Sequence, residues 1–147
     1  MADVTDNVHF QPYTGKDYWR GDSLQLAFDT MNDASSATPG YNSNDYEFGL
    51  FQNKDNTVFW DGTIAGKLIN QSSNETRVSI SRQNSKTIYR TAIPWSKLKL
   101  TSEAGMIFGF SCVANDNDGG GRNFWIGIPG IAPLKQPAYF RKLLLTE

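Results

Sequence analysis

The feature that most constrains the fold is a strict alternation of apolar and polar residues directly after a Gly-Asp turn. Leu24, Leu26 and Phe28 alternate with small or polar residues, which is the two-residue period of a β-strand that buries one face. No long stretch has the 3.6-residue period of an amphipathic helix. Further strands are expected at 46–51, 57–60, 77–82, 87–93, 105–114, 124–128 and 140–145. We therefore predict an all-β chain, an antiparallel β-sandwich of jelly-roll or immunoglobulin-like type, with helix confined to a turn or two near residues 94–98.

Composition agrees with this fold class and limits the partners. The chain is expected to form a single domain over residues 1–147, and its aromatic content of 13%, with 13 glycines, is typical of short strands joined by turns. The net charge is −1, so no excess of positive charge attracts nucleic acid or an anionic membrane. No apolar stretch approaches the ~18 residues of a membrane span. We expect neither nucleic acid nor membrane as a partner.

Trp19 lies just before the first clear strand, with Asp22 and Gln25 close by in the sequence. An indole offers a ligand a flat apolar face, and the neighbouring carboxylate and amide offer hydrogen bonds. The alternative is that Trp19 only covers the end of the sheet. The residues themselves leave both interpretations open.

The most unusual loop reads Asn-Asp-Asn-Asp-Gly-Gly-Gly-Arg and covers residues 115–122. Alternating Asn and Asp before Gly resemble the start of a calcium loop, but no Glu follows at the EF-hand spacing, so an EF-hand is excluded. Asp116 and Asp118, with backbone carbonyls, are the candidate ligands of a structural calcium ion of another type. The alternative is a turn closed by its own hydrogen bonds.

Catalytic residues are scarce. His9 is the single histidine, Cys112 is the single cysteine and lies in an apolar run that predicts a buried thiol, and the chain has no G-x-S-x-G motif. Paired carboxylates for glycoside hydrolysis stay open, because the separation of acidic side chains is not visible in a sequence. We predict that the chain is not an enzyme.

Four stretches in this order carry a resemblance to a known family: 19–25, 89–95, 113–119 and 135–140, which read WRGDSLQ, YRTAIPW, VANDNDG and KQPAYF. They resemble the family 9 carbohydrate-binding modules and their bacterial relatives, which are β-sandwiches attached to secreted glycoside hydrolases. The resemblance implies a non-catalytic module that binds a polysaccharide or oligosaccharide, such as xylan, cellulose or a related β-glycan. It also implies secretion and a parent glycoside hydrolase whose catalytic domain the module targets.

The resemblance also implies where a sugar binds. Members of the family that grip a terminal sugar hold it between two tryptophans. Trp19 matches the first tryptophan, whereas the second falls at Leu134. Gln25 takes the place of an acidic sugar-binding residue, and a basic contact falls at Gly49. The sugar site of this chain is therefore expected to depart from the family's pattern.

We expect Trp125 and Arg122 to replace what is lost, with Asn115 as a further hydrogen-bonding group. Indole stacks on the C–H face of a pyranose ring, while guanidinium and amide groups bond its hydroxyl edge. The predicted carbohydrate-binding residues are Trp19, Gln25, Asn115, Arg122 and Trp125.

The resemblance implies a module that is shortened at its N-terminus, because members of the family usually have further residues before the stretch matched here. If early strands of the sandwich are missing, an edge is left open, and proteins close such edges by dimerising or by exchanging strands. We expect self-association through the incomplete edge.

Two other functions are kept as alternatives. Relatives of this sandwich include haem-binding DOMON-type domains, for which His9 with Met31 or Met106 would have to supply the axial ligands. A structural or docking domain without sugar binding is favoured if Trp19 and Trp125 are buried.

Overall fold

The structure is a computed structural model that describes residues 1–37, 39–54, 56–63, 67–68 and 76–147. Its strands are β1 (Ala2–Thr5), β2 (Ser23–Asp29), β3 (Asp45–Asn53), β4 (Asn56–Thr63), β5 (Lys67–Leu68), β6 (Arg77–Gln83), β7 (Lys86–Ala92), β8 (Ile107–Asp116), β9 (Phe124–Gly127) and β10 (Arg141–Leu144). The same ranges contain three short 3-10 helices: η1 (Gly15–Arg20), η2 (Trp95–Leu98) and η3 (Pro137–Tyr139). None of the helices in these ranges is long and apolar enough to cross a membrane.

The larger of two sheets is built around β2. Its strand order is β10-β8-β2-β3-β4-β5, with β9 also paired to β8, and every pair is antiparallel. Gln25 of β2 lies opposite Gly49 of β3 on one side and Val113 of β8 on the other. This register brings residues from three distant parts of the chain side by side.

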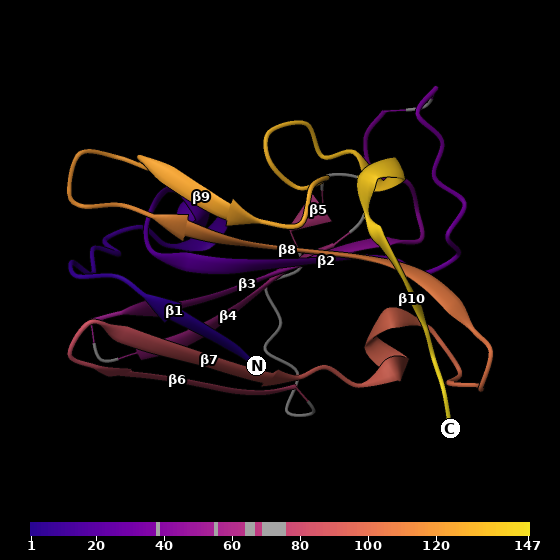
Figure 1. The fold of residues 1–147 in the computed structure, drawn as a ribbon, viewed down its shortest axis with the longest axis horizontal. Coiled ribbons are helices and arrows are strands. Elements are labelled where there is room, and N and C mark those ends of the chain that lie inside the picture. The colour runs from indigo at the N-terminus through magenta and orange to yellow at the C-terminus, as the bar shows by residue number, and fades with distance from the viewer. Residues whose placement is uncertain (38, 55, 64–66, 69–75) are drawn as a thin grey trace.

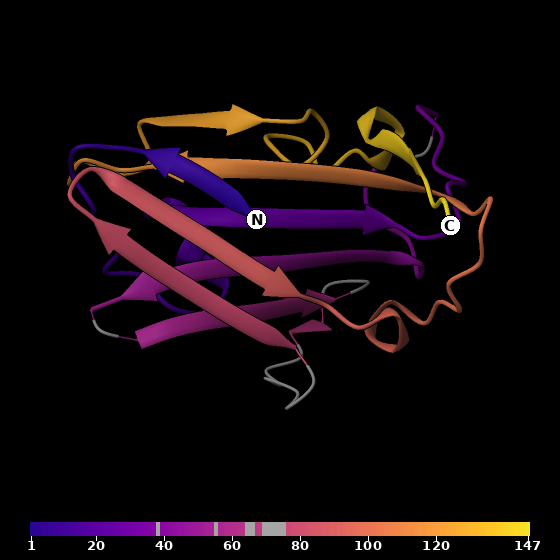
Figure 2. The ribbon, with the colours of Figure 1, turned by 60° about the horizontal axis from the view of Figure 1, so that its bottom comes forward.

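The smaller sheet consists of β1, β7 and β6 and lies obliquely across one face of the larger sheet (Figures 1 and 2). The apolar residues that alternate along the strands meet between the two layers. They form one buried cluster of Leu24, Leu26, Tyr46, Phe48, Leu50, Ile80, Tyr89 and Leu98. Full burial of one such side chain contributes about 1.5–3 kcal/mol. The protein is therefore the antiparallel β-sandwich that the alternation predicts.

The opposite face of the larger sheet, here called the outer face, is partly covered as well. Ala27 and Val113 pack there against Ile131 and Phe140, which come from the chain after β9. Because successive side chains of a strand point to opposite faces, polar residues in the same register as Ala27 also point outward. These residues are Gln25, Glu47 and Asn115.

β9 and β10 share one edge of β8 (Figure 1). β10 pairs with residues 107–110 and β9 with residues 113–116. In the interval between them, Ser111 Oγ donates to the Ile128 carbonyl at 2.8 Å, and the Ile128 N–H donates to the Cys112 carbonyl at 2.8 Å. The segment that leads from β9 to η3 is therefore fastened to β8 where it leaves the sheet.

Two details differ from the sequence prediction. The predicted helical turn is η2. The structure adds two further 3-10 helices, η1 and η3, which no periodic sequence pattern predicts because such helices are too short to show a period. Cys112 is half-buried rather than buried and packs at the side of the core cluster; burial still raises the pKa of its thiol.

Candidate functional site

The five residues singled out in the sequence come from η1, β2, β8, β9 and the loop between the last two strands, and they meet at the outer face. Arg122 contacts both tryptophans and Asn115, and Asn115 contacts Gln25. A pocket of about 240 Å³ opens there, lined by Trp19, Gln25, Arg122, Ile131, Ala132, Pro133 and Lys135. Asn115 and Trp125 are not part of the lining and lie against Arg122 instead.

Trp19 is held at the rim of the pocket by its neighbour in η1. Tyr18 is buried, and its ring centroid lies 5.5 Å from that of Phe51 and 4.9 Å from that of Trp60. A Cβ atom at Gly49 would lie 2.3 Å from the Tyr18 ring, so the ring fits only because residue 49 has no side chain. The position at which the family resemblance implied a basic contact is thus covered by a tyrosine. Trp19 remains 36% exposed.

Arg122 lies between the two indoles. Its guanidinium carbon is 4.6 Å from the ring centroid of Trp19 and 4.6 Å from that of Trp125, which is the range of a cation–π contact. Its Nη1 donates to Asn115 Oδ1 at 3.2 Å. Trp125 is 42% exposed. The three side chains therefore form one stack that fixes the spacing of the two indoles.

A buried chain of amides lies beneath this stack. Asn115 Nδ2 donates to Ser23 Oγ and to Gln25 Oε1, both at 3.0 Å. Gln25 Nε2 in turn donates to Glu47 Oε1 at 3.1 Å. These contacts join β8, β2 and β3 across the outer face. They also hold the Asn115 oxygen in the orientation that accepts from Arg122.

Glu47 ends this chain of hydrogen bonds and is almost fully buried. Lys135 Nζ donates to both of its carboxylate oxygens, at 2.5 Å for Oε1, and Tyr41 Oη donates to Oε2 at 2.8 Å. Burial and the charge of Glu47 raise the pKa of the Tyr41 hydroxyl. They raise the pKa of the Tyr18 hydroxyl in the same way. Both hydroxyls therefore stay protonated, and Lys135 balances the buried negative charge.

Sequence reasoning missed Glu47, Tyr41 and Lys135. Glu47 falls on the polar phase of β3 and therefore reads as solvent-facing, and only the chain that covers the outer face buries it. The one sequence signal for this group is that Lys135 belongs to the 135–140 motif that carries the family resemblance. Leu134, at the place of the second family tryptophan, is 69% exposed and does not line the pocket.

Asp116 and Asp118 lie apart from this pocket and gather with Asp6. One carboxylate oxygen from each lies within 4.8 Å of the others. Burial, with the negative charges of Asp6 and Asp118, raises the pKa of Asp116. The loop itself is closed by the buried side chain of Asn117, which donates to the Arg20 carbonyl at 2.6 Å and accepts from two glycine N–H groups. The loop is thus hydrogen-bonded, as the alternative stated, and its clustered oxygens also fit a hard cation such as Ca²⁺.

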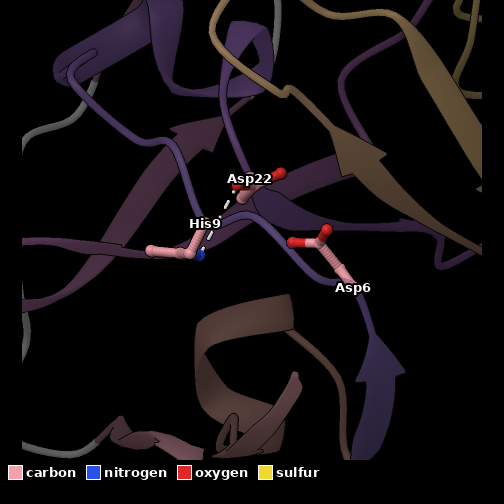
Figure 3. Close-up of side chains that lie close together, drawn as sticks. All are labelled: Asp6, His9 and Asp22. Carbon is pink, nitrogen blue, oxygen red and sulfur yellow. Dashed lines mark ion pairs between the residues drawn. The ribbon is translucent and has the colours of Figure 1, made fainter. Parts of the chain in front are cut away.

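A second group combines Asp6 with His9 and Asp22 (Figure 3). His9 Nδ1 lies 3.6 Å from Asp22 Oδ2. Burial raises the pKa of Asp22 to about 6, although its carboxylate accepts the N–H groups of Phe10 and Asn117. Asp22 therefore supports the turn before β2 and does not reach the pocket lining.

The position of His9 is incompatible with the proposed pairs of haem ligands. His9 lies beside Asp22, just before β2, whereas Met31 follows the other end of this seven-residue strand. At about 3.3 Å per residue the two ends are roughly 23 Å apart. Met106 precedes β8, whose far end pairs with the start of β2. Neither methionine can share an iron with His9.

Comparisons with known proteins give a family and a fold. A family model described as "Carbohydrate family 9 binding domain-like" matches residues 1–146. Two solved structures of a family 9 carbohydrate binding module from Caldicellulosiruptor kristjanssonii, one in complex with glucose and one with cellotriose, each align with a TM-score of 0.64. The identities are 16% and 17%, and the alignments cover 98% of this chain but 68% and 66% of those chains. No curated protein gave a significant match.

The two kinds of comparison agree with the geometry. The solved modules share the fold of this chain, and the family model extends over nearly all of its residues, including every element that contributes to the pocket. The chain therefore belongs to the carbohydrate family 9 binding domain-like family.

Proposed function

We propose that this chain is a non-catalytic carbohydrate-binding module and that the pocket beside Trp19 is its sugar site. The observation that carries the proposal is the convergence of Trp19, Gln25 and Arg122 on one pocket from distant parts of the chain. A pyranose ring presents C–H groups that stack on an indole and hydroxyls that need planar donors and acceptors. The pocket offers both kinds of contact.

The ligand that we propose is a β-glycan such as cellulose or xylan, or an oligosaccharide derived from one. The glucose and cellotriose held by the solved family 9 modules support a glycan of this type. The described part of the pocket is open and shallow, so a modest affinity is expected, because a small ligand makes few contacts.

The role that we propose in the parent protein is to bring a glycoside hydrolase to its substrate outside the cell. Membership of a family of binding modules supports a targeting role. The pocket lining contains no carboxylate and no histidine among the described residues, so the residues that face a bound sugar are suited to binding it rather than to cleaving it.

The structural or docking alternative is less well supported. It requires buried indoles, whereas Trp19 and Trp125 keep about two fifths of their surface exposed. Two exposed indoles that gather at one arginine are more typical of a binding surface than single exposed apolar residues are.

Trp19→Ala tests the proposal. Stacking aromatics are hot spots whose loss costs about 2 kcal/mol or more of binding free energy, so the affinity for cellotriose measured by titration calorimetry should fall at least about thirtyfold. The melting temperature should fall only slightly, because the side chain is partly exposed. Phe124→Ala is the matched control, since Phe124 is also an exposed aromatic but lines a different pocket. Unchanged affinity with a large loss of stability would assign Trp19 to packing.

A further inference from the structure

Arg122 differs from the other partly buried cations in having no acidic partner. It stacks between two indoles and donates to an amide oxygen, and no carboxylate pairs with it among the residues that the structure describes. The partly buried Arg82 and Lys97 face Asp6 and Asp61, and the more exposed Lys135 faces Glu47. The charge of Arg122 is therefore left for something outside the described chain.

The pocket as a whole carries an excess of positive charge. Arg122 and Lys135 line it, and no acidic residue does so within the described ranges. Glu47 lies behind Lys135, and its carboxylate is already saturated by Lys135, Tyr41 and Gln25. Burial lowers the pKa of Arg122, as expected where no carboxylate offsets desolvation. A ligand that brings a negative charge would supply the missing partner.

The stack restricts how a ligand can reach this charge. The guanidinium carbon lies over both indole rings, 4.6 Å from each centroid, so we infer that a ligand approaches along the free edge of the group, where the N–H groups point. One donor goes to Asn115, and the guanidinium has five in all. A carboxylate can accept two parallel N–H bonds from such an edge. A neutral hydroxyl accepts fewer bonds and leaves the charge unpaired.

We propose that the pocket selects an acidic sugar, a hexuronic acid residue of a glycan, and that Arg122 binds its carboxylate. This inference rests on the proposed sugar-binding function and adds the class of sugar. The sugar ring lies against the exposed part of Trp19, and the carboxylate points to the edge of the Arg122 guanidinium. Lys135 also lines the pocket, but its charge is balanced by Glu47, which leaves Arg122 as the charge available to the carboxylate.

The test compares sugars that differ only in the acid group. Titrations of the whole chain use glucuronate against glucose and against its own neutral methyl ester, and xylotriose with a glucuronic acid branch against the methyl ester of the same branched oligosaccharide. Hydrogen bonds to charged groups are the strong ones, so the acidic member of each pair should bind about tenfold more tightly at low salt. Added salt should shrink this preference, because the carboxylate is reached from solvent.

Variants assign the preference to Arg122. Arg122→Gln should abolish it, and Arg122→Lys should keep only part of it because a lysine lacks the fork. Arg90→Gln, the same change at an exposed position of the smaller sheet, should leave it intact. Equal or tighter binding of the neutral sugars overturns this inference and leaves the sugar-binding function standing. An acid preference that survives Arg122→Gln in a folded variant also overturns it. Binding of neither member of either pair overturns the function itself.

Discussion

The glycine beneath Tyr18 makes a sharp prediction about how the sugar platform is held in place. In the Gly49→Ala variant the new methyl carbon would lie 2.3 Å from two atoms of the Tyr18 ring and 2.7 Å from a third. An ordinary carbon contact needs about 3.5 Å, so the ring must retreat by about 1.2 Å. Phe51 and Trp60 contact the ring, and Tyr18 is fully buried, so its movement is restricted.

The cost follows from this confinement. Adding one carbon to a well-packed core costs about 1–3 kcal/mol, and a complete loss of the ring's packing would cost about 3–5 kcal/mol. For a chain of this length, 1 kcal/mol corresponds to about 2–4 °C of melting temperature. We therefore expect Gly49→Ala to lower the melting temperature by about 2–12 °C. Because Trp19 is the next residue along η1, sugar affinity should fall as well.

A double-mutant cycle measured by urea unfolding isolates the cause. In a Tyr18→Ala background the space above residue 49 is empty, so Gly49→Ala should cost almost nothing there. Gly120→Ala is the matched control for stability, because its new Cβ would meet nothing nearer than 3.8 Å. An equal cost of Gly49→Ala with and without the tyrosine ring would refute the reasoning.

Four further outcomes follow. Lys135→Met should lower the free energy of unfolding by about 1–3 kcal/mol, because the buried Glu47 carboxylate loses a charged partner that was itself partly exposed; adding Glu47→Gln should restore most of this loss, and simple additivity of the two changes in urea unfolding would contradict the pairing. Burial raises the pKa values of Asp22 and Asp45 to about 6 in the folded state, so the folded state binds these protons more tightly and stability should rise as pH falls from about 7 towards 4; Asp22→Asn should remove part of that rise in melting temperature, and Asp45→Asn a further part. If calcium binds at the acidic cluster, it should raise the melting temperature by mass action, and Asp118→Asn should remove the effect; identical melting in calcium and in chelator speaks against the site. Light scattering should detect dimers that pair through β10, an end strand of the larger sheet with four exposed residues, and Leu144→Lys should dissociate them; a monomer at high concentration argues otherwise.

The strands could be predicted because their signal is local. Leu24, Leu26 and Phe28 carry the period of β2 within seven residues, and the antiparallel hairpin of β3 and β4 follows from the turn between them. The candidate site was also partly visible, since Trp19 and Gln25 are near one another in sequence, as are Arg122 and Trp125.

What could not be predicted depends on pairing between distant segments. Asn115 bonds Gln25 only because β8 lies beside β2, although 90 residues separate them. Glu47 becomes buried only when Tyr41 and Lys135 cover it. Asp6 joins Asp116 for the same reason. The two-residue period of a strand shows which residues share a face. It does not show whether that face meets solvent or another part of the chain.

The segment between β9 and η3 builds one wall of the pocket and adds no strand to either sheet. It is tied to β8 through Ile128 and closes on itself, with the Gln136 N–H donating to the Gly130 carbonyl at 2.6 Å. Lengthening a loop costs little, about 0.6 kcal/mol for each doubling. Insertions here would reshape the pocket while the strand register stays as it is. Ligand preference can therefore diverge through this one loop, and modules with the same sheets can evolve different specificities without refolding.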